Sequence, residues 1–259
     1  MKATSNFTLP LIVVLALLTS CASCRSKPEM PAANAPTPTE YLQQANQLYA
    51  QREDLMRIRE GIIALRQART ADPGNYEAAW QQAKFDYYLA SHTDNDEERH
   101  KAIREGIEAG KAAVEIQDNK PDGHFWLGAN YGASAQGGVL AGLASIDDIR
   151  GEMLKVMSLN EGYQDGSAFM VLGMLYLQAP QIAGGDPQKA VQEMEKGLRY
   201  GPGNAFLRLH LAEAYLKVGR TADARTQLNA IVYMKPDQNY LPEYKEASTQ
   251  ARKLLVQAG

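Results

Sequence analysis

The sequence predicts an all-α fold, a helical-repeat solenoid of about five helix pairs with a C-terminal capping helix. Three observations predict it. From Glu40 onward apolar residues recur at spacings of three and four, which is the period of an α-helix. Breaker residues are confined to short turns such as residues 72–75, 201–204 and 235–237, and no stretch alternates convincingly with period two. Short motifs also recur along the chain, which indicates stacked repeats.

The recurring motif combines a leucine, a small residue and a tyrosine. Its three copies are Leu127-Gly128-Tyr131, Leu172-Gly173-Tyr176 and Leu211-Ala212-Tyr215. Residues 205–238 resemble the tetratricopeptide repeat (TPR), a 34-residue helix-turn-helix unit, because Ala224 and Pro236 follow Ala212 and Tyr215 at the TPR spacing. In such a unit the small residue lets two helices approach closely, the tyrosine fills the adjacent gap and the proline ends the second helix.

The N-terminal residues 1–20 have the features of a lipoprotein signal peptide. Lys2 precedes an apolar run at residues 9–18, which is shorter than the roughly 20 residues of a membrane-spanning helix. The tetrapeptide Leu18-Thr19-Ser20-Cys21 resembles the bacterial lipobox, so Cys21 is predicted to be acylated and to become the first mature residue. The alternative is a cleaved signal that leaves Cys21 as a free thiol.

Residues 21–39 are predicted to form a lipidated flexible tether, because they are rich in proline, alanine and polar residues. Ala22 follows the cysteine, where an aspartate would favour the inner membrane, so the resemblance implies a periplasmic protein anchored to the outer membrane. No cysteine follows Cys24, and the folded part must therefore be stable without internal disulfides.

Residues 40–259 form the predicted TPR-like domain. Its five copies are expected to begin near Leu42, Glu77, Pro121, Gly166 and Ala205, and a capping helix is expected from about Leu241 to Ala258. Three irregular segments interrupt the pattern. They are a polar segment at residues 91–99, an uncharged segment at residues 133–145 and a Pro/Gly-containing segment at residues 178–187, each expected to be an insertion.

The irregular repeats resemble the T component of tripartite ATP-independent periplasmic (TRAP) transporters. The likeness covers about Tyr76 to Leu255 and is carried by the segments at residues 125–132, 172–176, 179–190, 212–225 and 242–255, of which the Pro180 to Gly184-Gly185-Asp186 insertion is the most specific. Gly61 in the first repeat departs from the usual alanine. The resemblance implies a lipoprotein that associates with the substrate-binding component of the transporter and offers an apolar ligand a sheltered path.

Composition and motifs argue against catalysis and nucleic-acid binding. The formal net charge is only −3, and Lys and Arg are scattered. The one metal-like cluster, at residues 92–100, lacks zinc or calcium-loop spacing, and a helix start is the favoured interpretation of its acids. His124 and His210 are interpreted as buried or rim histidines. We therefore expect no enzyme activity, no cofactor and no metal.

The first helices of stacked pairs line the inner face of a solenoid, and there the chain is unusually apolar. The predicted ligand or partner groove consists of Phe85, Tyr88, Phe125, Trp126, Met170, Met174 and Leu177, roofed by residues 133–145. Two interpretations stay open: an exposed groove that binds, or a face buried as core. For Trp126, packing and ligand stacking are equally favoured.

The predicted function is a lipid-anchored periplasmic scaffold that binds a partner protein. The substrate-binding subunit of a TRAP-type transporter is the candidate partner, and an apolar small molecule is a candidate ligand. The membrane contact would come through the lipid anchor alone. The alternative is a TPR lipoprotein of envelope assembly, acting in outer-membrane protein insertion or pilus biogenesis.

Overall fold

The computed structural model describes residues 35–135 and 139–257 and places residues 36–259 in one compact unit. The predicted signal peptide, Cys21 and most of the tether lie outside the described residues. The described chain is all-helical, as predicted, with these α-helices: α1 (Pro38–Tyr49), α2 (Leu55–Ala71), α3 (Tyr76–His92), α4 (Asp96–Ile116), α5 (Pro121–Ala135), α6 (Val139–Leu159), α7 (Ser167–Gln178), α8 (Pro187–Tyr200), α9 (Ala205–Lys217), α10 (Thr221–Tyr233) and α11 (Leu241–Gln257). Two short 3₁₀ turns are η1 (Gln181–Ala183) and η2 (Gln238–Tyr240).

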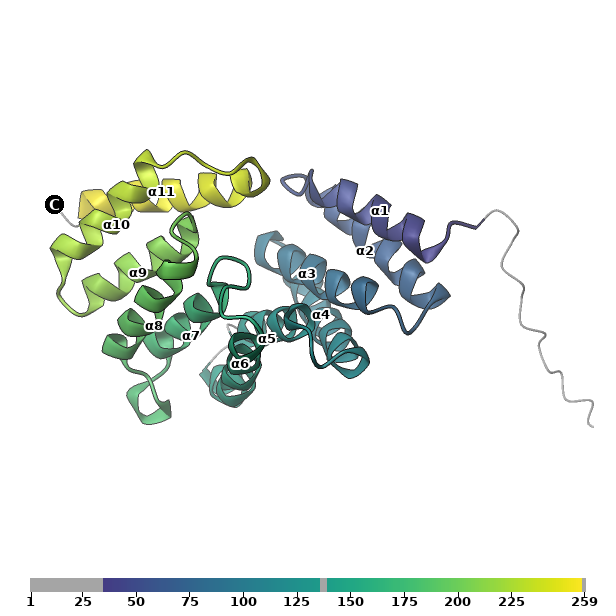
Figure 1. Ribbon diagram of the computed structural model, residues 1–259, viewed down its shortest axis with the longest axis horizontal. Helices are drawn as coiled ribbons and strands as arrows, with labels where there is room; N and C mark the ends of the chain where they lie inside the picture. Colours follow the sequence, from purple (N-terminus) through teal and green to yellow (C-terminus); the bar gives the residue numbers. More distant parts are fainter. Residues whose placement is uncertain (1–34, 136–138, 258–259) are drawn as a thin grey trace, which may run out of the picture. The chain divides into compact units, whose positions relative to one another are not determined.

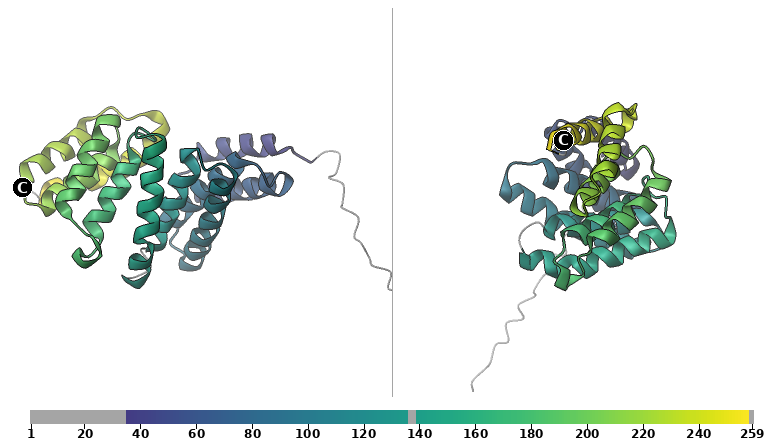
Figure 2. Two further views of the ribbon diagram at one scale, coloured as in Figure 1. Left: turned by 60° about the horizontal axis from the view of Figure 1, so that its bottom comes forward. Right: turned by 90° about the vertical axis from the view of Figure 1, so that its left-hand side faces the viewer.

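The helices pack as consecutive pairs, α1 with α2 through α9 with α10, and each pair packs on the next (Figure 1). The first helix of every pair begins within four residues of its predicted start. Helix α11 follows the fifth pair and packs on α9 and α10, so the predicted capping helix is confirmed. Figure 2 shows the same succession of hairpins from two further sides.

Local side-chain chemistry explains where these helices begin. At the start of α1, Thr37 and Glu40 form a reciprocal capping box, with the Thr37 amide donating to Glu40 Oε2 at 2.6 Å. In the turns before α3, α4 and α9, an asparagine accepts a backbone hydrogen bond of 2.9–3.0 Å from the first turn, through Asn75, Asn95 and Asn204. The turn residues that interrupt the apolar pattern are thus the residues that cap the next helix.

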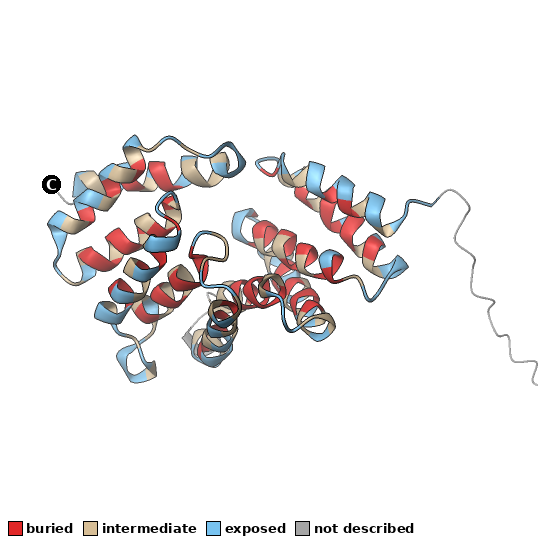
Figure 3. Ribbon diagram, in the orientation of Figure 1, coloured by how far each residue is buried: buried red, intermediate tan, exposed pale blue. Residues whose placement is uncertain are grey.

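The helices carry both buried and exposed residues (Figure 3), and the buried apolar residues form two main clusters. The first belongs to α1–α4 and contains Ile58, Leu65 and Phe85. The second runs mainly from α5 to α11 and contains Met153, Leu172 and Met194, all at most 2% exposed. Each repeat therefore buries its apolar face against its neighbours, as a solenoid must.

Close helix contacts depend on residues without a bulky side chain. A Cβ atom at Gly173 in α7 would lie 2.5 Å from Met194 Cγ in α8. At Gly61 in α2 it would lie 2.2 Å from Phe85 Cε1 in α3. Both distances are shorter than real contacts, so glycine is required there. The departure from alanine at Gly61 therefore makes room for a large side chain of the next repeat.

Two of the three expected insertions are mostly helical. The polar segment at residues 91–99 contributes only residues 93–95 to a turn, because Asn95 caps α4 and the acids Asp96, Glu97 and Glu98 fill its first turn. In residues 133–145, α5 continues to Ala135 and α6 begins at Val139, so alanine and aliphatic residues there extend the helices. Residues 136–138 lie outside the described chain.

The third irregular segment, at residues 178–187, is an insertion as predicted. It contains η1 and ends at the Asp186 cap of α8, whose side chain accepts from the amides of Gln188 and Lys189 at 3.0 Å. Gly184 has a φ of +88°, a left-handed conformation that favours glycine.

Among the described helices, none is both long and apolar enough to cross a lipid bilayer.

Candidate functional site

Four of the predicted groove residues are buried. Phe85 and Tyr88 belong to the first core cluster, while Phe125 and Trp126 belong to the second, and all four are 1–8% exposed. Of the two interpretations left open by the sequence, burial as core therefore applies to these four residues. The physical reason is packing between repeats: the ring of Phe85 lies against Gly61 of α2 and 5.0 Å from the ring of Tyr49.

The other three predicted groove residues, Met170, Met174 and Leu177, lie on α7 and are only partly buried against the second cluster. Leu177 also lines a surface pocket, together with the 178–187 insertion and Lys217 of α9. The structure therefore separates the predicted groove into core residues and a half-exposed apolar strip on α7. A role of that strip in binding stays a prediction.

Trp126 packs as a core residue, with its ring in contact with other aromatic rings but its ring nitrogen unpaired. The indole contacts Phe125 edge-on, with ring centroids 5.1 Å apart, and lies 5.8 Å from the ring of Tyr87. Its Nε1 is buried without a hydrogen-bond partner among the described residues. Gln81, Asp86 and Asn130 each carry one such oxygen, so the α3 and α5 helices contain four unpaired polar atoms.

Asp86 on α3 is a fully buried carboxyl group. Its Oδ2 accepts a hydrogen bond from Gln82 Nε2 at 3.1 Å, and Oδ1 has no partner in the described chain. Burial raises the pKa of Asp86 to about 7, although the Gln82 hydrogen bond and the charges of Arg66 and Arg69 act in the opposite direction. The sequence did not single out this residue, because an aspartate within a helix is usually solvent-exposed.

His124 and His210 have structural partners. His124 is 4% exposed, its Nδ1 lies 2.6 Å from Glu152 Oε2, and its Nε2 lies 3.0 Å from the Asp118 carbonyl oxygen. This confirms the interpretation of a buried, hydrogen-bonded histidine. His210 pairs with Glu213 at 2.8 Å on the same helix. Within the described residues, no group of three or more His, Cys, Asp or Glu side chains could hold a metal ion.

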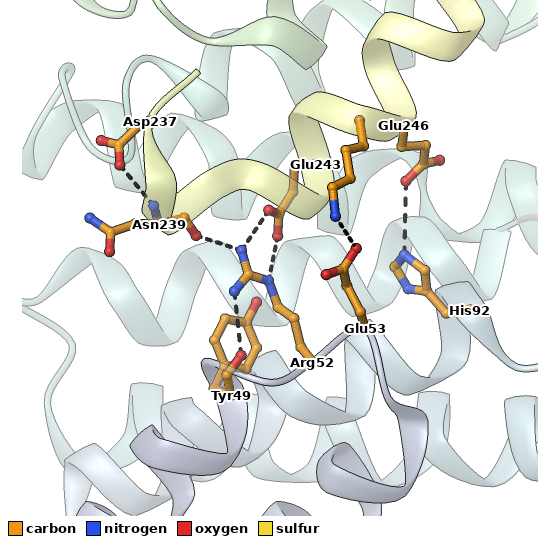
Figure 4. A network of polar contacts seen from close by, with 9 residues as sticks. Tyr49, Arg52, Glu53, His92, Asp237, Asn239, Glu243 and Glu246 are labelled. Atoms are coloured by element: carbon orange, nitrogen blue, oxygen red, sulfur yellow. Dashed lines mark hydrogen bonds and ion pairs between the residues drawn. The ribbon is translucent and has the colours of Figure 1, made fainter. Parts of the chain in front are cut away.

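The most extensive polar contact joins the two ends of the repeat domain (Figure 4). Arg52, in the turn between α1 and α2, donates from Nε to Glu243 Oε1 at 2.8 Å and from Nη2 to Glu243 Oε2 at 2.6 Å. It also donates from Nη2 to the Asn239 carbonyl oxygen at 2.5 Å and from Nη1 to the Tyr49 carbonyl oxygen at 3.3 Å. The Arg52 side chain is only 5% exposed, so a charged contact spanning 191 residues is largely shielded from water.

Two weaker pairs flank this contact (Figure 4). Lys245 Nζ lies 2.8 Å from Glu53 Oε1, and His92 Nε2 lies 3.9 Å from Glu246 Oε2. Both of these pairs are substantially exposed and contribute little to stability. The bidentate Arg52–Glu243 pair is therefore the dominant link between α11 and the first helix pair.

A second cation lies beside Arg52. Lys84 Nζ on α3 lies 3.6 Å from the centre of the Tyr49 ring, in cation–π geometry. Burial and the charge of Arg52 lower the pKa of Lys84 to about 8, against the opposing effect of Glu243. We call Tyr49, Arg52, Lys84 and Tyr88 the Arg52 site. Sequence reasoning missed it, because its residues and Glu243 lie on elements that are far apart in the sequence.

Comparisons with known proteins agree with this architecture. The model of the family described as regulator of microtubule dynamics protein 1-3 matches residues 41–183, more than half of the chain. The chain belongs to this family. A tetratricopeptide-repeat model matches residues 181–251, so the two matches together extend from α1 into α11. No curated protein sequence matches the chain significantly.

Solved structures resemble this member of the regulator of microtubule dynamics protein 1-3 family in fold alone. A thermophilic TPR protein from Thermus thermophilus is 19% identical with a TM-score of 0.62, covering 85% of this chain and 99% of its own. PilF of Pseudomonas aeruginosa is 17% identical with a TM-score of 0.55, covering 85% of this chain and 90% of its own. Both confirm the predicted TPR-like solenoid.

Proposed function

We propose that the protein is a lipid-anchored periplasmic scaffold that binds a partner protein through the half-exposed apolar strip on α7, and that it works by binding rather than by catalysis. The observation that carries this proposal is the TPR architecture, a fold typical of protein–protein interaction, which leaves Met170, Met174 and Leu177 partly accessible on one helix. Methionine suits such a surface, because its unbranched thioether adapts to varied shapes.

The cellular setting comes from the N-terminal sequence. The lipobox-like Leu18-Thr19-Ser20-Cys21 supports anchoring by Cys21, and Ala22 supports the outer membrane. The description of the family refers to microtubule dynamics, and a bacterial periplasm contains no microtubules. We therefore propose a scaffold role for this protein without an effect on microtubules. The substrate-binding subunit of a TRAP-type transporter is the partner we propose, on the resemblance of residues 76–255, and an apolar molecule is the proposed ligand.

The test is cross-linking in cells followed by capture of the full-length protein and identification of the bound partner. Met174→Asp should reduce capture at least tenfold, because it places a charge in the apolar strip. Leu154→Asp is the matched control, since Leu154 on α6 is 51% exposed and outside the strip. Recovery of a TRAP substrate-binding subunit supports the proposal. Recovery of outer-membrane insertion or pilus-assembly proteins instead would favour the envelope-assembly function.

A further inference from the structure

We propose that the Arg52 site is a docking site for an acidic segment of a partner protein, and that Glu243 of the chain's own capping helix occupies it in the free protein. This inference rests on the proposed function, because it assumes a protein partner, and it assigns that partner a chemistry. It concerns the first two helix pairs, whereas the strip on α7 belongs to the fourth.

The geometry at Arg52 is that of carboxylate recognition. The planar guanidinium group presents two parallel N–H donors, and both carboxylate oxygens of Glu243 accept from it at 2.6–2.8 Å. The adjacent Asn239 carbonyl oxygen accepts a third hydrogen bond. Arg52 therefore binds both a side chain of α11 and the backbone of the turn that precedes it. A partner with a glutamate or aspartate on an exposed segment offers the same groups.

The contact with α11 can be released without opening the core. The buried apolar residues of α11, Ala247 and Ala251, belong to the second core cluster, and α11 packs on α9 and α10. The buried residues of α1 and α2, such as Leu42 and Ile58, belong to the first cluster. The described links between α11 and the α1–α2 turn are polar, so they can break while α11 stays packed on α9 and α10.

The Arg52 site contains two cations, Arg52 and Lys84. Glu243 is the carboxylate that contacts Arg52, whereas Glu53 and Glu246, whose charges also reach Tyr88, lie beside Lys245 and His92. Lys84 forms no hydrogen bond or ion pair with a carboxylate within the described chain, although its charge interacts with that of Glu243. Its ammonium group lies over the Tyr49 ring and is positioned for a second anionic group. A segment with two or more carboxylates therefore fits the site better than the single internal glutamate.

The experiment measures binding of a fluorescent hexaglutamate peptide to the full-length protein by anisotropy. Glu243→Ala should bind it at least ten times more tightly than the wild type, because the internal competitor is removed. The matched control is Glu193→Ala, which changes the net charge equally and, within the described residues, breaks the ion pair with Lys196 on α8. It should bind as the wild type does. The double variant Arg52→Ala/Glu243→Ala should lose the gain.

Equal affinity of the wild type and Glu243→Ala, or unchanged affinity in the double variant, would overturn the proposal. Binding of Glu243→Ala to phosphatidylglycerol vesicles but not to hexaglutamate would overturn it as well. Circular dichroism checks folding, and Glu243→Gln replaces the alanine variant if that one does not fold. Capture of a partner that is sensitive to Met174→Asp but insensitive to Arg52→Ala would reject this inference and leave the proposed function standing.

Discussion

At Asp86 a carboxyl group lies in the interior of the α3–α4 region with one oxygen unpaired among the described residues. Burial makes the neutral form the more stable one in the folded protein, and the pKa of Asp86 rises to about 7 from a usual value of 3.8. Residues of this kind connect stability to pH, because the folded and unfolded chains bind protons with different affinity.

Asp86→Asn should therefore change the pH dependence of stability. With a raised folded-state pKa, the contribution of Asp86 is fully present below about pH 4 and is lost as the pH rises through about 7. The variant should gain on the order of 2–4 kcal/mol relative to the wild type between pH 4 and pH 8. Urea unfolding at several pH values measures this difference.

The control for Asp86→Asn is Asp147→Asn, because Asp147 is exposed on α6 and its ion-pair partner among the described residues is Arg150 in the next turn. Comparing each variant with the wild type at the same pH cancels groups that act in the opposite direction. Glu98 is one of these, since its hydrogen bond with Arg59 lowers its pKa to about 2. A pH-independent difference between Asp86→Asn and the wild type would show that Asp86 is ionised in the folded protein.

At the scale of single elements, helix pairs are held together by surfaces with little room. Between α7 and α8, a Cβ at Gly173 would overlap Met194 Cγ and lie 3.2 Å from the Ala190 carbonyl oxygen. In α6, by contrast, a Cβ at Gly151 meets nothing within 4 Å. The same residue type thus serves packing at one position and has no packing role at the other.

Gly173→Ala should destabilise the protein by about 1–3 kcal/mol through overpacking, and Gly173→Leu should cost more. Gly151→Ala should instead stabilise it by about 0.5–1 kcal/mol, because alanine favours the helix and nothing obstructs it. Thermal melts of the variants measure both effects. A stabilising effect of Gly173→Ala would mean that α7 and α8 do not pack as closely as in this structure.

Local periodicity and the turn residues were sufficient to predict most of the helices and their pairing, although two of the expected insertions are mostly helical. The predicted turns contain Asn75 and Asn204, which cap α3 and α9, and the Leu-small-Tyr motif lies on the first helices of the third, fourth and fifth pairs. The groove was predicted only in part. The position of a residue in a helix indicates the side of the helix on which it lies, but not whether another repeat packs against that side. Phe85 lies on the expected helix, yet its burial against Gly61 depends on how two repeats stack.

Contacts between distant segments were the least predictable. Arg52 stands among polar residues in a turn, and nothing in its neighbourhood distinguishes a buried arginine from a solvated one. Its pairing with Glu243 can be predicted only when the arrangement of all five helix pairs is known. The same holds for Asp86 on α3, whose carboxyl group interacts with charges on α2 and α4, helices of two different repeats.

At the scale of the whole molecule, the predicted anchor decides where the repeat domain works. Cys21→Ala should abolish acylation and leave the protein soluble or unprocessed, because two or more acyl chains are needed for durable membrane binding. Fractionation and intact-mass measurement of the mature chain test this. The control is Cys24→Ala, which should behave as the wild type. An unmodified Cys21 thiol in the wild-type protein would refute the prediction.

The Arg52–Glu243 pair also bears on the order of events in folding. Neighbouring repeats form contacts that are local in sequence, whereas this pair closes a loop of 191 residues. Closing the loop costs chain entropy, and the hydrogen bonds of the pair are the contacts that offset it. It should form after the main folding barrier. Glu243→Ala should therefore accelerate unfolding while leaving the refolding rate within about twofold of the wild type, as stopped-flow kinetics can measure. The unfolding rate of a protein built from local repeats would then depend on the contact that forms last, the Arg52–Glu243 pair.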